Sequence, residues 1–149
     1  MIPVNIPIII LIERVKTMIR VLVTDGMDKN AIEQLKKQGY QVSEQYYPSE
    51  ELGAAMAQYD ALVVRSATKV RSCHIDAAKG SALKLIIRGG VGIDNIDVQY
   101  AETNGIAVRN TPNASSRSVA ELALGHIFSC CRFISAAGHS MREDKWEKK

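Results

Sequence analysis

The chain contains the stretch Arg88-Gly89-Gly90-Val91-Gly92-Ile93-Asp94-Asn95-Ile96-Asp97, directly after the apolar run Leu83-Lys84-Leu85-Ile86-Ile87. The apolar run has the length of a buried strand, and Asp94, Asn95 or Asp97 can cap a helix that follows it. Glycines between a strand and a helix let the backbone turn sharply and leave several N–H groups facing one point. Such a turn can hold a carboxylate or a phosphate, although Gly-rich turns are also ordinary punctuation in α/β domains. The stretch therefore predicts an α/β fold with a candidate site for a small anion.

Five short apolar segments alternate with helical patterns along residues 20–109. Strands are predicted at 20–24, 41–46, 61–65, 83–87 and 106–109, and helices at 28–38, 49–58, 72–78 and 98–104. Ser49 is the predicted cap of the second helix. The polar content of 41–46 and the nearby Pro48 place that strand near an edge, whereas 61–65 reads as a central strand. Strands separated by single helices predict a flavodoxin-like, doubly wound parallel sheet of five strands.

A long helix is predicted after Pro112. It opens at Ser115 or Ser116 and continues to about Ser135, and Gly138 and His139 interrupt the pattern that follows. One broad face of this helix is apolar and carries Val119, Leu122, Ala123, His126, Ile127 and Cys130.

The composition restricts the class of protein. A chain of 149 residues can bury one core but cannot hold two full domains. Its 19 basic and 16 acidic residues leave a net charge of +3, which is too small to indicate a nucleic-acid surface. Three cysteines without metal-ligand spacing fit a reduced, cytoplasmic setting and predict no metal site.

The first 17 residues differ from the rest in composition. Their apolar run, residues 6–12, is too short to span a bilayer and lacks a positive flank and a cleavage site, so no membrane partner is expected. Because the composition changes at Met18, we expect Met18 to be the natural start and 1–17 to be a non-native or disordered arm. The alternative is an additional edge strand or a structured terminal arm.

The pattern Arg-x-Gly-x-Gly-x-Asp-Asn-Ile-Asp at 88–97 resembles the substrate-loop signature of the D-isomer-specific 2-hydroxyacid dehydrogenases. Two further blocks agree in order and spacing: Val-Arg-Ser-Ala-Thr-Lys-Val at 64–70, and Asn-Thr-Pro-Asn at 110–113 followed by Ser-Val-Ala-Glu-Leu at 118–122. The resemblance extends over residues 18–149 and is strongest to the members that oxidise phosphoglycerate. It implies a substrate-binding catalytic domain at 18–112, a hinge at 110–113, and a linker helix with the start of an NAD-binding domain at 113–149.

The resemblance also implies which residues hold the substrate. Arg65 and Arg88 end neighbouring predicted strands, where two guanidinium groups suit a doubly anionic substrate. Ser66 continues the first of these blocks, and the alternative for Arg65 is a solvated arginine at a strand end. Backbone N–H groups of Gly90, Val91 and Gly92 are expected to bind the substrate carboxylate. Val91 is also the position at which the family's loop approaches the nicotinamide.

No catalytic residue is assigned. A dinucleotide turn needs Gly-x-Gly-x-x-Gly and an acidic residue about 20 positions later, and Gly89-Gly90-Val91-Gly92 has the wrong spacing. The family's catalytic Arg, Glu and His lie beyond that turn, so we expect an N-terminal piece of a dehydrogenase that is inactive alone. The three histidines are interpreted as structural, Glu121 as an ion-pair or dimer-contact residue, and Trp146 with Lys148 as part of an interface. Asn95 and Asp97 are expected to be caps and turn formers rather than ligands.

The implied activity is NAD-dependent oxidation of 3-phosphoglycerate to 3-phosphohydroxypyruvate in serine synthesis, by a homo-oligomer whose partner is the small hydroxy acid. The identity of that acid and the choice between NAD and NADP are left open. The alternative is a non-catalytic, flavodoxin-like module that binds a small anion or a partner protein.

Overall fold

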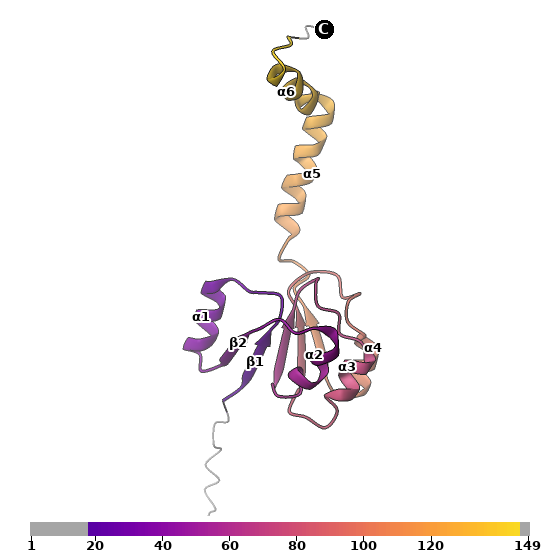
Figure 1. Cartoon of the computed structure of the whole chain (residues 1–149). Coiled ribbons are helices and arrows are strands. Elements are labelled where there is room, and N and C mark those ends of the chain that lie inside the picture. The colour runs from indigo at the N-terminus through magenta and orange to yellow at the C-terminus, as the bar shows by residue number, and fades with distance from the viewer. Residues whose placement is uncertain (1–17, 147–149) are drawn as a thin grey trace, which may run out of the picture.

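The computed structural model describes residues 18–146 and shows one parallel sheet flanked by helices, with a helical extension at its C-terminal end (Figure 1). The expected arm at 1–17 and Lys148 lie outside the described residues. The strands are β1 (Arg20–Val23), β2 (Gln41–Glu44), β3 (Ala61–Val64), β4 (Leu85–Arg88) and β5 (Ala107–Asn110). The helices are α1 (Lys29–Lys37), α2 (Ser49–Met56), α3 (Ser72–Ala77), α4 (Val98–Thr103), α5 (Ser116–Cys131) and α6 (Ile134–Arg142).

The sheet has the strand order β2-β1-β3-β4-β5, and every neighbouring pair is parallel. This is the order of flavodoxin-like folds, so the predicted fold class is confirmed, with β2 at an edge and β3 in the centre. Leu22, Leu62 and Ile86 are partners across β1, β3 and β4 and are fully buried. They form the main core with Leu52, Met56 and Ile75 from α2 and α3. Alternate residues of the strands form a second, smaller cluster on the opposite face, namely Val21, Val23, Ala61 and Val63.

Local turn chemistry sets several of the helix boundaries. Asp28 caps α1 by accepting hydrogen bonds from the N–H groups of Asn30 and Ala31. Gly39 and Gly105 follow α1 and α4 with φ of 91° and 77°, a conformation that costs other residues energy. The prediction for Ser49 is wrong, because Pro48 occupies the cap position and Ser49 is the first residue of α2.

The predicted single helix up to about Ser135 is also wrong. The chain breaks at Phe133, whose φ of 55° is left-handed, and Gly138 and His139 lie inside α6 instead of interrupting it. The two helices bend by 66° at this junction. No single helix within residues 18–146 is long and apolar enough to cross a membrane, and α5 with α6 meets that requirement only as a bent pair.

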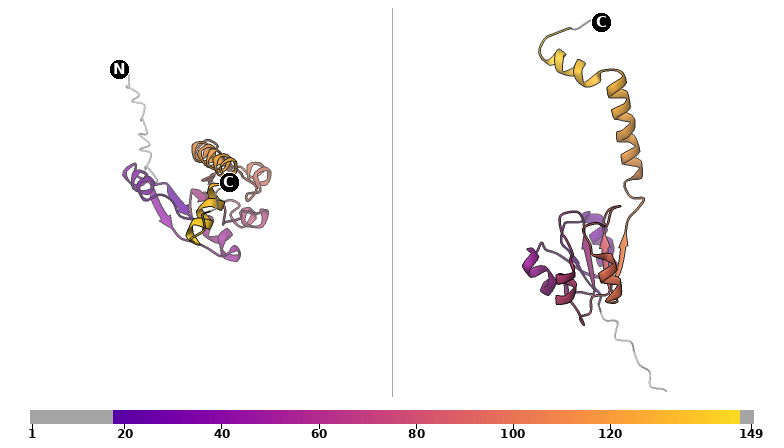
Figure 2. Two further views of the ribbon diagram at one scale, coloured as in Figure 1. Left: turned by 90° about the horizontal axis from the view of Figure 1, so that it is seen from above. Right: turned by 90° about the vertical axis from the view of Figure 1, so that its right-hand side faces the viewer.

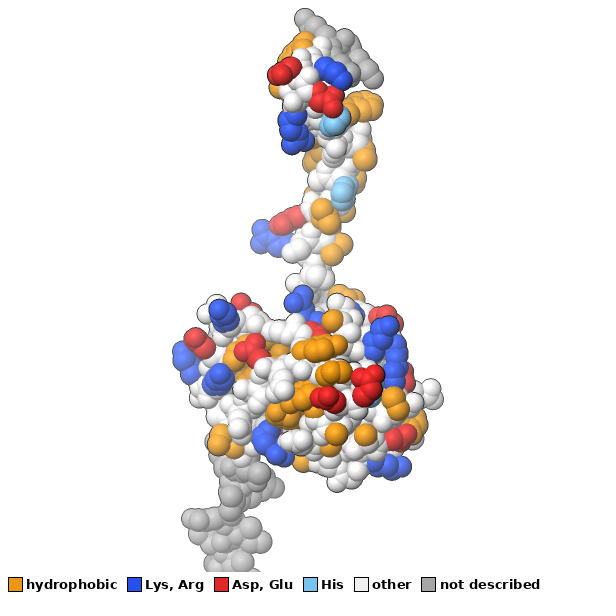
Figure 3. All heavy atoms as spheres, viewed as in Figure 1, with side chains coloured by type: hydrophobic (Ala, Val, Ile, Leu, Met, Phe, Trp, Pro, Cys, Tyr) orange, Lys and Arg blue, Asp and Glu red, His pale blue; other side chains and the backbone are white. Residues whose placement is uncertain are grey.

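Helices α5 and α6 extend away from the sheet, and none of their residues is buried (Figures 1 and 2). Apolar side chains line α5 in the space-filling view (Figure 3). The exposed fractions lie between 55% and 61% for five of these residues, namely Val119, Leu122, Leu124, Ile127 and Phe128. The extension therefore gains no tertiary burial within the described residues.

We expect the amide hydrogens of α5 and α6 to exchange much faster than those of the sheet. Helices of this length are marginally stable in water without packing, so local opening should cost little free energy. Hydrogen exchange followed by mass spectrometry on the full chain measures both regions at once. Protection of α5 equal to that of β3 would contradict this expectation and would mean that its apolar side chains are covered in solution.

Candidate functional site

The loops that follow β1, β3, β4 and β5 meet at the C-terminal edge of the sheet, the edge from which α5 rises (Figure 1). Ligands of open α/β sheets bind at this edge. Two loops carry the predicted substrate residues. The first follows β3 and contains residues 65–68, which we call the Arg65 loop. The second follows β4 and contains residues 89–95, which we call the glycine loop.

The carboxylate of Asp25, just after β1, binds the N–H side of the Arg65 loop. Its Oδ2 accepts hydrogen bonds from the backbone N–H groups of Arg65 at 2.7 Å and Thr68 at 3.0 Å. Its Oδ1 accepts from the Thr68 hydroxyl, which lies 2.9 Å from the hydroxyl of Thr24. Partial burial raises the pKa of Asp25, but the bonds from Thr68, Arg65 and Ala67 together outweigh it and lower the pKa below its ordinary value. Asp25 is therefore ionised at neutral pH.

The side chain of Asn95 binds the carbonyl side of the same loop. Its Nδ2 donates to the carbonyl oxygens of Arg65 at 2.8 Å and Thr68 at 2.7 Å. Asn95 is buried, and its Oδ1 has no hydrogen-bond partner within residues 18–146. Asp97 stands at the cap position of α4, but its carboxylate accepts from the Ser72 N–H at 2.8 Å and from Arg71 Nη1 at 3.0 Å. Asn95 thus stabilises a neighbouring loop and Asp97 the start of α3, rather than α4.

Arg65 itself projects from this fixed loop. Its residue is exposed, and its guanidinium has no hydrogen bond or ion pair within the part of the chain that the structure describes. Ser66 is also exposed, and its N–H has no acceptor there. An anion at this edge can therefore reach both groups without displacing an internal partner.

The glycine loop turns its carbonyl groups inward. Asn110 Nδ2 donates to the Val91 carbonyl at 2.6 Å, the Thr111 N–H donates to the Gly90 carbonyl at 3.1 Å, and Arg88 donates to the Gly92 carbonyl. The N–H groups of Val91 and Gly92 have no acceptor within residues 18–146, and the Val91 residue is 51% exposed. Both N–H groups can therefore donate to a carboxylate without losing an internal hydrogen bond.

Arg88 differs from Arg65 in its surroundings. The Arg88 guanidinium packs against the glycine loop that follows it. The approach at Gly92 is close, because a Cβ added there would stand 2.9 Å from Arg88 Nη1. Its Nε is buried without an acceptor among the described residues. In this conformation Arg88 shapes the glycine loop, and its contact with substrate stays a prediction, as do those of Arg65, Ser66, Val91 and Gly92. The Gly90 N–H, which was also predicted to bind the carboxylate, instead donates to the Arg88 carbonyl at 2.9 Å.

A sequence profile described as D-isomer specific 2-hydroxyacid dehydrogenase, catalytic domain, matches residues 21–144. The chain belongs to this family. Residues 64–70, 88–97 and 110–113, on which the predicted resemblance rests, all lie inside the matched region, so that prediction is confirmed.

Two curated relatives and one solved structure illustrate the similarity. Hydroxypyruvate reductase from Thermotoga maritima is 49% identical over 131 residues, covering 87% of this chain and 42% of the relative. D-3-phosphoglycerate dehydrogenase from Sus scrofa is 45% identical over 131 residues, covering 87% of this chain and 24% of the relative. The NAD+-bound 3-phosphoglycerate dehydrogenase of Entamoeba histolytica superposes with a TM-score of 0.63 at 31% identity, covering 75% of this chain and 39% of that chain. The chain therefore spans less than half the length of the curated relatives it matches.

Two of the three histidines have partners among the described residues, and His126 is exposed on α5. His74 is buried, and its Nδ1 accepts the Arg71 N–H at 3.0 Å. Its Nε2 therefore carries the hydrogen and donates to the Ser49 hydroxyl at 3.0 Å, so this histidine cannot activate Ser49 as a nucleophile. His139 Nε2 lies 3.2 Å from a carboxylate oxygen of Glu143, and Glu121 pairs with Arg117 at 2.8 Å. Within residues 18–146 no three His, Cys, Asp or Glu side chains gather as metal ligands.

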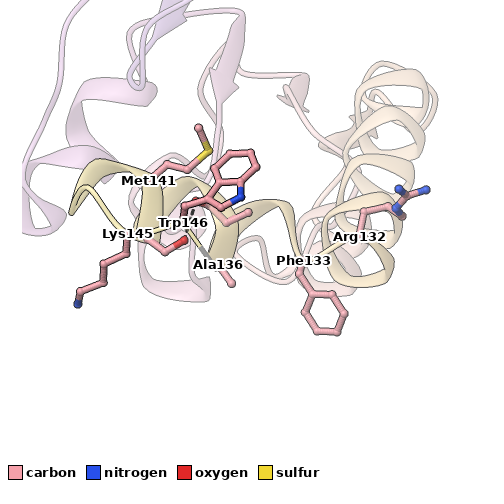
Figure 4. Close-up of a pocket in the computed structure, with 8 residues that line it drawn as sticks. Arg132, Phe133, Ala136, Met141, Lys145 and Trp146 are labelled. Atoms are coloured by element: carbon pink, nitrogen blue, oxygen red, sulfur yellow. Dashed lines mark hydrogen bonds between the residues drawn. The ribbon is translucent and has the colours of Figure 1, made fainter. Parts of the chain in front are cut away.

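A groove of about 310 Å³ lies in the helical extension rather than at the sheet edge (Figure 4). Its lining comes from α6 and the residues flanking that helix, among them Arg132, Phe133, Met141 and Trp146. It contains none of the predicted substrate residues.

Asp25 is a residue of the site that was not predicted from the sequence. The signal was available, because Asp25 directly follows the strand predicted at 20–24 and ligands gather where such strands end. Its function is indirect, since both carboxylate oxygens are occupied by the Arg65 loop.

Proposed function

We propose that the chain is the substrate-holding part of an NAD-dependent dehydrogenase that oxidises 3-phosphoglycerate to 3-phosphohydroxypyruvate. The observation that carries the proposal is a pair of anion-binding groups on the loops after the neighbouring strands β3 and β4. These are the guanidinium of Arg65 and the N–H groups of Val91 and Gly92, all without a partner within residues 18–146. A substrate with a phosphate at one end and a carboxylate at the other needs two separate anion-binding groups. Arginine suits the phosphate, and backbone N–H groups suit the carboxylate.

The relatives support this proposal and also supply a competing one. Similarity to D-3-phosphoglycerate dehydrogenase favours the phosphorylated substrate. The identity to hydroxypyruvate reductase is slightly higher and favours a substrate without phosphate. Both reactions interconvert a hydroxy acid and its keto acid, so the difference lies in the anion that Arg65 faces.

The residues present do not form a dinucleotide site. The sequence has no Gly-x-Gly-x-x-Gly, since Gly90 and Gly92 are followed by Asn95 where the third glycine is required. NAD is therefore proposed for the whole protein, where it would accept the hydride, and none of its contacts is assigned to residues 18–146 except the predicted approach of Val91. The described residues bind and orient the acid. Homo-oligomeric assembly and a cytoplasmic location are part of the same proposal.

We expect the 149-residue chain alone to reduce no NAD in the presence of 3-phosphoglycerate. It lacks a dinucleotide turn, and no histidine at the sheet edge is free to take the hydroxyl proton. Absorbance at the nicotinamide band measures the rate against an identically purified blank. Turnover that follows the chain through a second purification step would contradict the expectation.

Titration of the isotope-labelled full chain with 3-phosphoglycerate, D-glycerate and inorganic phosphate tests the substrate. We expect 3-phosphoglycerate to bind more tightly than D-glycerate and to shift the amide signals of Arg65, Val91 and Gly92. Equal affinity for the two acids would favour the hydroxypyruvate reductase alternative. If no acid shifts these signals, the dehydrogenase proposal fails in favour of a module that binds a partner protein.

A further inference from the structure

The Arg65 loop is bound on both of its backbone sides by side chains that are distant in sequence. Asp25 lies 40 residues before Arg65, and Asn95 lies 30 residues after it. We propose that Asp25 and Asn95 are positioning residues that hold the Arg65 loop in the shape that binds the anionic substrate. This inference rests on the proposed function and concerns two residues that do not contact the substrate themselves.

The contacts of Asp25 fix the donor side of the loop. One carboxylate accepts from two backbone N–H groups and one hydroxyl, and bonds to an ionised acceptor are about twice as strong as bonds between neutral groups. The groups that face this carboxylate are all donors from Arg65, Ala67 and Thr68. The backbone of Arg65 is thereby fixed next to the end of β1, and the position at which its side chain starts is fixed with it.

The contacts of Asn95 fix the acceptor side and connect the two loops of the site. The side-chain nitrogen of Asn95 bridges the carbonyls of Arg65 and Thr68, and the backbone carbonyl of Asn95 accepts the Val70 N–H at 2.8 Å. Because Asn95 belongs to the glycine loop, the spacing between Arg65 and the N–H groups of Val91 and Gly92 depends on it. A site formed before binding avoids the entropy cost of ordering loops when the ligand arrives.

An electrostatic role and a positioning role of Asp25 predict opposite changes in substrate affinity for the substitution Asp25→Asn. Removing the negative charge of Asp25 near an anion site should strengthen anion binding if charge alone matters. If Asp25 acts by positioning, Asp25→Asn should weaken binding, because an amide cannot accept from all three donors and turns its own N–H₂ toward some of them.

The experiment measures 3-phosphoglycerate affinity and amide exchange of the full chain in matched variants. Asp28→Asn is the control for Asp25→Asn, since Asp28 also accepts two backbone N–H groups but does so at the start of α1. Asn104→Ala is the control for Asn95→Ala, since within residues 18–146 the Asn104 side chain donates only to the Tyr100 carbonyl, in its own helix α4. We expect Asp25→Asn and Asn95→Ala to weaken binding by at least about tenfold and to speed exchange at Arg65 and Thr68, while both controls bind as the wild type does.

Unchanged or tighter binding by Asp25→Asn would overturn the proposal. Equal weakening in Asp25→Asn and Asp28→Asn would also overturn it, because the effect would then be general destabilisation. If the wild-type chain does not bind 3-phosphoglycerate, the proposed function fails, and amide exchange at Arg65 and Thr68 without ligand decides whether the two side chains fix the loop. If Asn95→Ala does not fold, Asp25→Asn and its control still give the decision.

Discussion

Replacing Gly53 with alanine is expected to lower the free energy of unfolding by about 2 kcal/mol, although alanine is the better helix former. Gly53 lies in α2 where this helix crosses α3. A Cβ added there would stand 2.6 Å from the Cβ of Ala77 and 3.2 Å from the backbone of His74. Real Cβ atoms do not approach so closely, so α2 and α3 must move apart and disturb the core contacts between Leu52, Met56 and Ile75.

Gly125→Ala in α5 is the matched control for this prediction. A Cβ at Gly125 meets no atom within 4 Å, so only the helix propensity changes and no loss of stability is expected. Urea unfolding followed by circular dichroism gives the free energy for both variants. Gly53→Ala as stable as the wild type would show that the crossing of α2 and α3 relaxes without cost.

The fold could be predicted from the sequence because its signals are local. The strands at residues 20–24 and 61–65 are short apolar runs, and single helices between strands leave only a parallel sheet. Asp28, Gly39 and Gly105 mark helix boundaries through their own side chains or through the lack of one. Each of these residues acts on its immediate neighbours, so the pattern in the sequence is sufficient.

The errors concern residues whose behaviour depends on distant partners. Nothing in the sequence around Phe133 marks a helix break, since neither glycine nor proline occurs there. Ser49 has the side chain of a cap, but its hydroxyl pairs with His74 of α3, 25 residues away. The contacts of Asn95 with the Arg65 loop are equally non-local. The candidate anion site could be placed at the sheet edge from the sequence, but the side chains that hold its loops could not.

Replacing Arg65 with alanine is expected to weaken binding of 3-phosphoglycerate by roughly a hundredfold, because a guanidinium can hold a phosphate with two charge-assisted hydrogen bonds. The backbone of the loop should be unchanged, since Asp25 and Asn95 bind only the N–H and carbonyl groups of this residue. Lysine keeps the charge but not the planar fork, so Arg65→Lys should restore part of the affinity.

Arg20→Ala is the control for this substitution. It removes the same charge at the opposite edge of the sheet, where Arg20 lies 3.5 Å from Asp60, and it should leave binding within about twofold of the wild type because exposed ion pairs contribute little. Calorimetric titration of each variant with 3-phosphoglycerate and with D-glycerate then identifies the group that Arg65 holds. If Arg65 binds the phosphate, Arg65→Ala weakens binding of 3-phosphoglycerate and leaves the affinity for D-glycerate almost unchanged. A parallel loss for both acids would instead assign Arg65 to the carboxylate that they share, and the argument for a phosphorylated substrate would lose its main support.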